Sequence, residues 1–166
     1  GRAASLAQQV IFAEEYARAG IPGRINHIGI ELAGPTILTF GTDEQKRRFL
    51  PDIAAGRTIF CQGFSEPGAG SDLASVRTKG VVENGEWVVN GQKIWTSLAH
   101  ISDWIFVVTR TTEGSAGPKG LSFLMMPLNQ PGIEVRPIRQ INGDAEFNET
   151  FFTDARCPEN SLIGAP

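Results

Sequence analysis

The sequence predicts an α+β fold, in which an N-terminal α-helical segment is followed by an antiparallel β-barrel-like domain. Apolar residues recur at helical spacing in the first third of the chain. After about Arg57 the pattern changes to short β-branched and aromatic runs separated by Gly and Asn, with no helical segment between them. We therefore expect residues 1–57 to be the C-terminal part of an all-α domain and residues 58–166 to be an antiparallel β-barrel domain.

The helical part divides into several stretches. A first amphipathic helix is indicated by apolar residues on one face, and Gly20 followed by Pro22 predicts its end. A second stretch over residues 28–40 should be interrupted or restarted at Gly34 and Pro35, because proline is tolerated only in a first turn. The apolar face of the first helix consists of Leu6, Val10, Ala13 and Ala17.

A capping box predicts where the next helix begins. In the run Thr42-Asp43-Glu44-Gln45, the Thr42 hydroxyl can accept from the backbone N–H of Gln45, and the Gln45 side chain can reach back to Thr42. We expect this helix to end at Pro51 and to be followed by a short helical turn at residues 53–56.

The β-rich part predicts short strands joined by tight turns. Asn84-Gly85 between two apolar runs is a strong hairpin signal, and Asn90-Gly91 predicts a second turn soon after it. The sheet is thus expected to be antiparallel and to close into a barrel or fold into a sandwich, which would protect its edges. The predicted strands are residues 58–65, 76–83, 87–89, 92–96, 104–110, 121–127, 133–137 and 149–153.

Charge and composition exclude some function classes. The chain of 166 residues has 15 basic and 18 acidic side chains and a net charge of −3, so nucleic acid is not indicated as a partner. No apolar run approaches the roughly 20 residues of a membrane span.

Cys61 and Cys157 lie in apolar or strand-edge settings and are expected to be buried small hydrophobes, which suits a reducing, cytoplasmic location. Because the chain begins at Gly1 without a methionine, we expect it to be a fragment.

A Gly/Pro-rich loop over residues 62–71, QGFSEPGAGS, is the strongest candidate for a binding site. Pro67 fixes φ, while Gly68 and Gly70 permit positive φ, so a tight loop could expose successive backbone N–H groups to an anion or to the polar edge of a heterocycle. The alternative is a simple loop between two strands. Hydroxyls at its two ends could bind one large ligand at separated points; these belong to Ser65 and Ser71.

Two segments carry a resemblance to a known family. Residues 64–72, FSEPGAGSD, are followed by residues 90–97, NGQKIWTS, and in this order and spacing they resemble the two flavin-contacting signatures of the acyl-CoA dehydrogenase family. The resemblance extends to residues 40–51 and 152–160, so it covers nearly the whole chain.

The resemblance implies FAD as the cofactor, with the β domain covering one face of the isoalloxazine ring. It implies that Ser71 contacts the substrate as well as the cofactor. Trp95 independently offers a flat π surface and an N–H donor, although a core aromatic is an equal interpretation from position alone. Glu66 and Asp72 are expected to accept backbone hydrogen bonds rather than to act as bases. The implied cofactor-binding residues are Gln62, Phe64, Ser65, Gly70, Ser71, Trp95, Thr96 and Ser97.

The implied reaction is the α,β-dehydrogenation of an acyl-CoA thioester, as in fatty acid β-oxidation. A carboxylate base removes the Cα proton, hydride passes to the flavin, and the electrons leave through an electron-transfer flavoprotein. In this family the base lies on helices beyond the β domain, so no residue of this chain is assigned as catalytic. The resemblance also implies a homo- or hetero-tetramer.

Three alternatives stay open. The chain could belong to a non-catalytic flavin-binding subunit of a heteromeric dehydrogenase, to an acyl-CoA oxidase that uses oxygen, or to a non-redox β-barrel binding module. The acyl group is also open. Residues 142–149, NGDAEFNE, carry acidic residues where many family members have small hydroxyls, which leaves bulkier or branched acyl groups as an alternative to straight chains.

Overall fold

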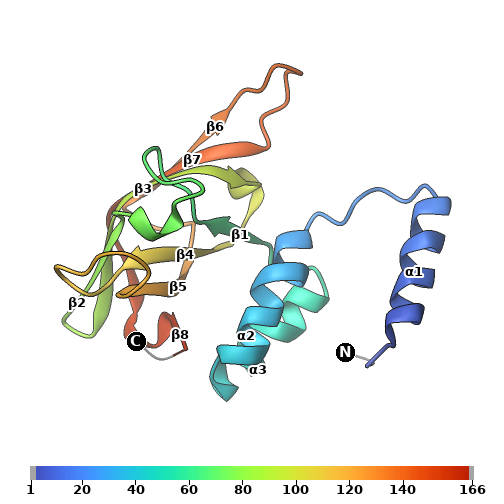
Figure 1. Ribbon diagram of the computed structural model, residues 1–166, viewed down its shortest axis with the longest axis horizontal. Coiled ribbons are helices and arrows are strands. Elements are labelled where there is room, and N and C mark those ends of the chain that lie inside the picture. The colour runs from blue at the N-terminus through green and yellow to red at the C-terminus, as the bar shows by residue number, and fades with distance from the viewer. Residues whose placement is uncertain (1–2, 165–166) are drawn as a thin grey trace.

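The computed structural model describes residues 3–164, and its chain begins with helices and continues as a sheet (Figure 1). The helices are α1 (Leu6–Arg18), α2 (Gly34–Phe40) and α3 (Asp43–Ala54), and a π-helical turn (Gly29–Ala33) precedes α2. The mixed α+β fold class is therefore confirmed. None of the helices within residues 3–164 has the length and apolar character needed to cross a lipid bilayer.

The predicted capping box begins α3. The Thr42 hydroxyl accepts from the Gln45 backbone N–H at 3.2 Å, and the Gln45 side-chain oxygen accepts from the Thr42 N–H at 2.9 Å. The predicted break at Pro51 is wrong, because α3 continues through it to Ala54. The backbone carbonyl that Pro51 leaves without a donor belongs to the exposed Arg47, where water can replace the missing N–H.

Eight strands follow in sequence. Two of them coincide with the predicted bounds, and Asn84 and Gly85 form the predicted hairpin turn with φ values of 54° and 81°. The strands are β1 (Phe60–Gly63), β2 (Lys79–Glu83), β3 (Glu86–Ser97), β4 (Trp104–Arg110), β5 (Leu121–Pro127), β6 (Ile133–Ile138), β7 (Phe147–Pro158) and β8 (Leu162–Ile163).

The second predicted turn, at Asn90-Gly91, is wrong. The two short strands expected on either side of it are one continuous strand, β3, paired with the equally long β7. The register shift between Val89 and Gly91 is a bulge of the partner strand β7. Its residue Asp154 has a φ of 52° and exchanges two 2.9 Å hydrogen bonds with the Asn90 side chain. Pairing along all of β7 thus replaces the local turn.

The sheet is mostly antiparallel, but two expectations about it need correction. The strand β1 pairs in parallel with β4, from Phe60 opposite Trp104 to Gly63 opposite Val107, because the long connection through β2 and β3 allows a crossover. The sheet is also not closed, so a barrel is wrong in the strict sense. The strand order is β6-β7-β3-β2-β4-β5-β8. At one end, β6 leaves the sheet as a protruding hairpin with β7 (Figure 1), and at the other end lies the two-residue β8.

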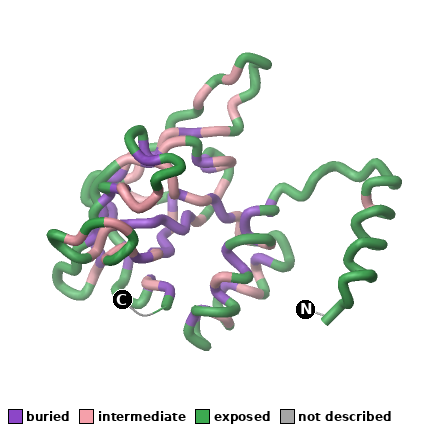
Figure 2. The backbone as a smooth tube through the Cα atoms, viewed as in Figure 1, coloured by how far each residue is buried: buried purple, intermediate pink, exposed green. Residues whose placement is uncertain are grey.

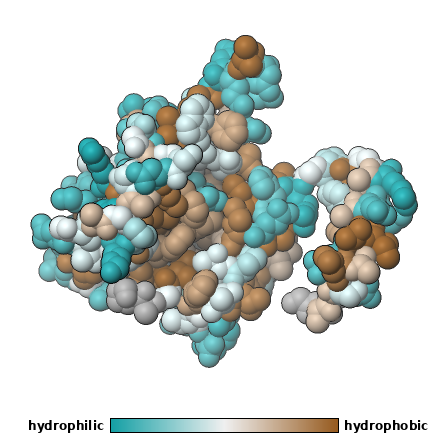
Figure 3. Space-filling model, viewed as in Figure 1, coloured by the Kyte–Doolittle hydropathy of each residue, from teal (hydrophilic) through white to brown (hydrophobic). Residues whose placement is uncertain are grey.

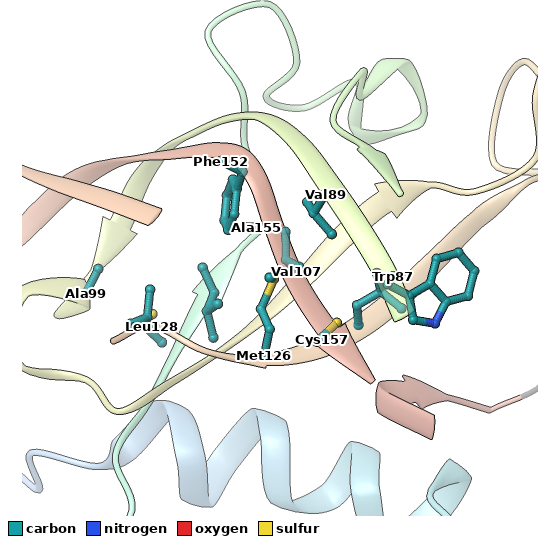
Figure 4. Packing of buried hydrophobic residues seen from close by; sticks show 12 residues of the cluster. Trp87, Val89, Ala99, Val107, Met126, Leu128, Phe152, Ala155 and Cys157 are labelled. Carbon is teal, nitrogen blue, oxygen red and sulfur yellow. The ribbon is translucent and has the colours of Figure 1, made fainter. Parts of the chain in front are cut away.

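Two larger hydrophobic cores and a smaller cluster around Val76 and Val108 are found within residues 3–164. One of the larger cores lies within the curved sheet and includes Trp87, Met126, Phe152 and Cys157 (Figure 4). Both cysteines are free and buried in this core, as predicted. The second core joins the helices to the sheet through Phe49 of α3, which packs edge-to-face on Phe60 and Trp104.

The helix α1 stands apart from both cores. It begins with a capping box at Ser5 and buries no residue (Figure 2). An extended connection separates it from α2 (Figure 1), and Figure 3 shows apolar atoms gathered on its surface. Its exposed apolar side chains are Leu6, Val10, Ile11 and Phe12.

Candidate functional site

A pocket of about 120 Å³ lies between the end of β1 and the second half of β3. It contains residues from both sequence segments that predicted the cofactor site, although residues 73–89 separate these segments along the chain. The structure therefore places the indole of Trp95 and the hydroxyl of Ser65 beside the same cavity. The lining residues are Ile28, Gln62, Phe64, Ser65, Ile94, Trp95 and Ser97.

A β-bulge in β3 shapes this pocket. Between the pairs Lys93–Thr150 and Thr96–Asn148, two residues of β3, Ile94 and Trp95, lie opposite a single residue of β7. Trp95 has a φ of 59°, which is uncommon for a bulky side chain, and its indole is 56% exposed. Strained backbone at an exposed aromatic residue is typical of functional positions rather than of core packing.

The bulge also joins the two signature segments. The Ile94 N–H donates to the Ser65 carbonyl at 2.9 Å instead of to a β7 neighbour. The Trp95 ring packs edge-to-face against Phe147 of β7, with ring centroids 6.1 Å apart. The indole is therefore supported along its edge by Phe147, while more than half of its surface stays exposed.

Other residues assigned to the cofactor lie outside this pocket. The Thr96 side chain is completely buried, and its hydroxyl has no hydrogen-bond partner within the described residues. Gly70 and Ser71 are exposed on the continuation of the loop and do not line the pocket. The roles of these three residues stay predictions.

The loop closes with a tight turn rather than with positive-φ glycines. Glu66 and Ala69 exchange two backbone hydrogen bonds of 2.9 and 3.0 Å around Pro67 and Gly68. The expectation that glycines supply positive φ here is wrong, because neither Gly68 nor Gly70 adopts it. A Cβ added at either glycine would meet no atom within 4 Å, so both face open space.

Glu66 acts as the predicted loop-fixing acceptor. Its carboxylate accepts from the backbone N–H groups of Arg77 at 2.7 Å and Thr78 at 2.9 Å, and from the Lys93 ammonium at 2.8 Å. Burial alone would raise the pKa of Glu66, but these hydrogen bonds outweigh it and hold the pKa below its usual value. Asp72 differs, since its exposed carboxylate accepts no hydrogen bond from residues 3–164.

Sequence reasoning missed two buried residues behind the pocket. Lys93 is 0% exposed and lies two residues before Trp95, a position at which a lysine normally reaches solvent. Asn148 of β7 is also fully buried and donates to the backbone carbonyl of Thr96 at 2.9 Å. No signal in the sequence pattern distinguishes these side chains from ordinary polar residues on an exposed strand face.

The pocket is too small to enclose a whole cofactor. Its volume is below the roughly 300–1,000 Å³ of a typical enclosed ligand site, so this chain would cover only part of a ligand. An exposed indole provides a flat apolar contact, and the hydroxyls of Ser65 and Ser97 provide hydrogen-bonding groups at its border.

Comparison with known families agrees with the fold. The model of the acyl-CoA dehydrogenase N-terminal domain matches residues 1–57, and that of the acyl-CoA dehydrogenase middle domain matches residues 61–155. The chain belongs to the acyl-CoA dehydrogenase family. Members of this family are FAD-dependent oxidoreductases, and the predicted family resemblance is confirmed.

Individual curated relatives match all or nearly all of this acyl-CoA dehydrogenase chain. It is 57% identical over 166 residues to acyl-CoA dehydrogenase IpdE1 of Mycobacterium tuberculosis, matching 100% of this chain and 43% of that protein. The chain thus spans less than half the length of this curated relative.

Two solved structures share its fold. The Tcur3481-Tcur3483 steroid ACAD G363A variant superposes with a TM-score of 0.91 at 34% identity, covering 99% of this chain and 43% of the other. The ChsE4-ChsE5 complex from Mycobacterium tuberculosis gives a TM-score of 0.88 at 42% identity, with coverage of 99% and 43%.

Proposed function

We propose that this chain supplies the flavin-facing wall of an FAD-dependent acyl-CoA dehydrogenase. Residues 1–57 would form the C-terminal part of the N-terminal helical domain, and residues 58–166 the middle domain. The observation that carries the proposal is the pocket at which Ser65, Trp95 and Ser97 converge, since these residues come from two separate segments.

Each residue of the pocket has a role that its chemistry supports. The exposed indole of Trp95 would pack against the isoalloxazine, while the hydroxyls of Ser65 and Ser97 would hydrogen-bond its polar edge. When bound, FAD supplies the hydride acceptor, and hydrogen bonds from the protein tune its readiness to accept hydride. Thr96 would contribute through its backbone, because its side chain is buried.

The remaining assigned residues would extend this wall. Gln62 and Phe64 line the pocket, and Phe64 is held in place by edge-to-face contacts with Phe106 and Phe123. Gly70 and the exposed Ser71 would contact the cofactor farther along the loop, with Ser71 also reaching the substrate. No residue is proposed as the catalytic base.

For the substrate, we propose a bulky acyl-CoA thioester rather than a straight-chain one. The support is the acidic stretch of residues 142–149, together with a structural relative whose title describes a steroid ACAD. The electrons would pass to an electron-transfer flavoprotein.

A heteromeric assembly is a specific second element of the proposal. One structural relative is a complex of two named proteins, ChsE4 and ChsE5, and shares 42% sequence identity with this chain. We propose a tetramer in which this chain belongs either to the catalytic subunit or to a flavin-binding partner that lacks the base.

The test uses a complete protein that contains this chain, expressed with and without a neighbouring dehydrogenase subunit. We expect the purified protein to show the visible absorption of bound flavin and to oxidise a polycyclic acyl-CoA in the presence of an artificial electron acceptor. Flavin that is reduced by substrate but produces hydrogen peroxide in air would favour the oxidase. A colourless protein that takes up no added FAD would overturn the proposal.

A further inference from the structure

A buried ion pair joins Glu66, which follows Ser65 of the pocket, to Lys93, which precedes Ile94 of the pocket. The Lys93 side chain is 0% exposed and that of Glu66 is 8% exposed, and the distance from Nζ to Oε1 is 2.8 Å. Burying two charges in this way is costly unless their remaining hydrogen bonds are satisfied. Here the carboxylate has two backbone donors besides the lysine, and the ammonium has a second acceptor, the Phe64 carbonyl at 3.0 Å.

These contacts hold three consecutive loop residues to two consecutive strand residues. Lys93 Nζ binds the carbonyl of Phe64 and the side chain of Glu66, and the N–H of Ile94 binds the carbonyl of Ser65 between them. The pairing of β1 with β4 ends at Gly63, so residues 64–66 have no ladder of their own. Within residues 3–164, the hydrogen bonds that fix residues 64–66 directly to β3 are therefore those of Lys93 and Ile94.

The same contacts determine the shape of the proposed flavin surface. Trp95 follows Ile94 in the bulge, whereas Ser65 lies between the two residues that Lys93 binds. If the loop shifted along β3, the Ser65 hydroxyl would move with respect to the indole while the sheet itself stayed intact. A misplacement of about 1 Å in a binding group can cost roughly 100-fold in function.

We propose that Lys93 is a positioning residue for the flavin site, which it serves by fixing the loop of Phe64, Ser65 and Glu66 against the Trp95 bulge. The inference rests on the proposed function. It goes beyond that function because Lys93 does not line the pocket and is not among the residues expected to touch the cofactor.

The experiment compares three variants in a complete protein that contains this chain. Lys93→Met removes both hydrogen bonds but leaves Glu66 buried without its partner. The double variant Lys93→Met/Glu66→Gln also removes that unpaired charge, so it should be more stable than Lys93→Met, although the glutamine can accept from only one of the Arg77 and Thr78 N–H groups and the Phe64 carbonyl still lacks its donor. The control is Thr150→Val, because Thr150 lies opposite Lys93 in the β3–β7 register, is fully buried and has a hydroxyl with no hydrogen-bond partner among residues 3–164.

The readouts are the FAD dissociation constant from fluorescence titration and the visible circular dichroism of bound flavin, both measured on folded protein. We expect Lys93→Met and the double variant to raise the dissociation constant roughly 10- to 100-fold and to alter the flavin dichroism. Thr150→Val should change neither. Wild-type affinity and dichroism in the double variant would overturn the positioning role, whereas an unsubstituted protein that binds no FAD would overturn the proposed function itself.

Discussion

The backbone N–H of Ile94 donates to the carbonyl of Ser65 at 2.9 Å and so connects two segments that lie far apart in sequence. Beside this bond the strand bulges, and the indole of Trp95 is exposed at the pocket border. The geometry of the candidate site therefore arises from an irregularity in β3 and not from its regular ladder.

Replacing Trp95 with alanine should affect flavin binding more than folding. Because the indole is 56% exposed, its loss should change the free energy of unfolding little, while the FAD dissociation constant should rise roughly tenfold, equivalent to about 1.4 kcal/mol. Flavin titration and thermal unfolding measure the two effects. The control is Ile141→Ala, at a fully exposed position in the connection between β6 and β7. Equal affinities for both variants would contradict a flavin contact by Trp95.

The stability contributed by Glu66 should depend on pH. Its pKa in the folded chain lies below its usual value of about 4.3, so the ionised form stabilises the fold above that pH, and this contribution is lost as pH falls through the lower folded pKa. Glu66→Gln should cost about 3 kcal/mol at neutral pH, since it leaves Lys93 buried without its charged partner. Urea unfolding between pH 7 and pH 3 should show that the difference in the free energy of unfolding between Glu66→Gln and wild type becomes smaller as the pH falls. A difference that stays constant would disprove this account.

Substitution of Asn26 should destabilise the fold more than most substitutions outside the site. Its buried side chain donates to the carbonyls of Ile53 and Thr58 and accepts from the Phe60 N–H, so it links the helices to β1. Asn26→Ala removes the side-chain partner of the Thr58 carbonyl and of the Phe60 N–H, while the Ile53 carbonyl keeps the Gly56 N–H, and it should lower the free energy of unfolding by roughly 2–4 kcal/mol. The neighbouring exposed His27 provides the control, because His27→Ala should stay within about 0.5 kcal/mol of wild type.

The two cysteines should be inert in the native state. Burial raises the pKa of Cys61 to about 12 and that of Cys157 to about 11, so the reactive thiolate is scarce at neutral pH. Ellman's reagent should label neither thiol until the chain is unfolded. A cysteine introduced at the exposed position of Ser71 should react at once, and native labelling without that substitution would argue against the buried environment.

Local sequence signals predicted those elements that are stabilised locally. The apolar runs of β4 and β5 gave the strand bounds, the Asn84-Gly85 turn has the positive φ values that asparagine and glycine tolerate, and the Thr42 box begins α3. Trp95, Ser65 and Ser97 were selected together from a family motif, and they do line one pocket.

Features that depend on distant partners could not be predicted in this way. Asn90-Gly91 has the composition of a turn, but the long strand β7 pairs across it and carries the irregularity itself. The parallel pairing of β1 with β4 depends on the course of the intervening chain. Lys93 and Asn26 are polar residues that are buried with partners distant in the sequence. Lys93 donates to Glu66, 27 positions away, and Asn26 accepts from the Phe60 N–H, 34 positions away. Sequence periodicity contains no record of these partners.

The helix α1 has 13 residues and buries none of them, so within residues 3–164 it is stabilised by local contacts: its capping box, its backbone hydrogen bonds and side-chain pairs such as Arg18 with Glu15 and Phe12 with Tyr16. Isolated helices of about 12–15 residues are marginal in water. The amide hydrogens of α1 should therefore exchange with deuterium almost as quickly as those of an unstructured peptide, while the amides of β4 require global opening. In this chain, the rate of deuterium uptake would therefore distinguish a helix that is stabilised by local contacts from a sheet that is stabilised by pairing and packing with distant segments.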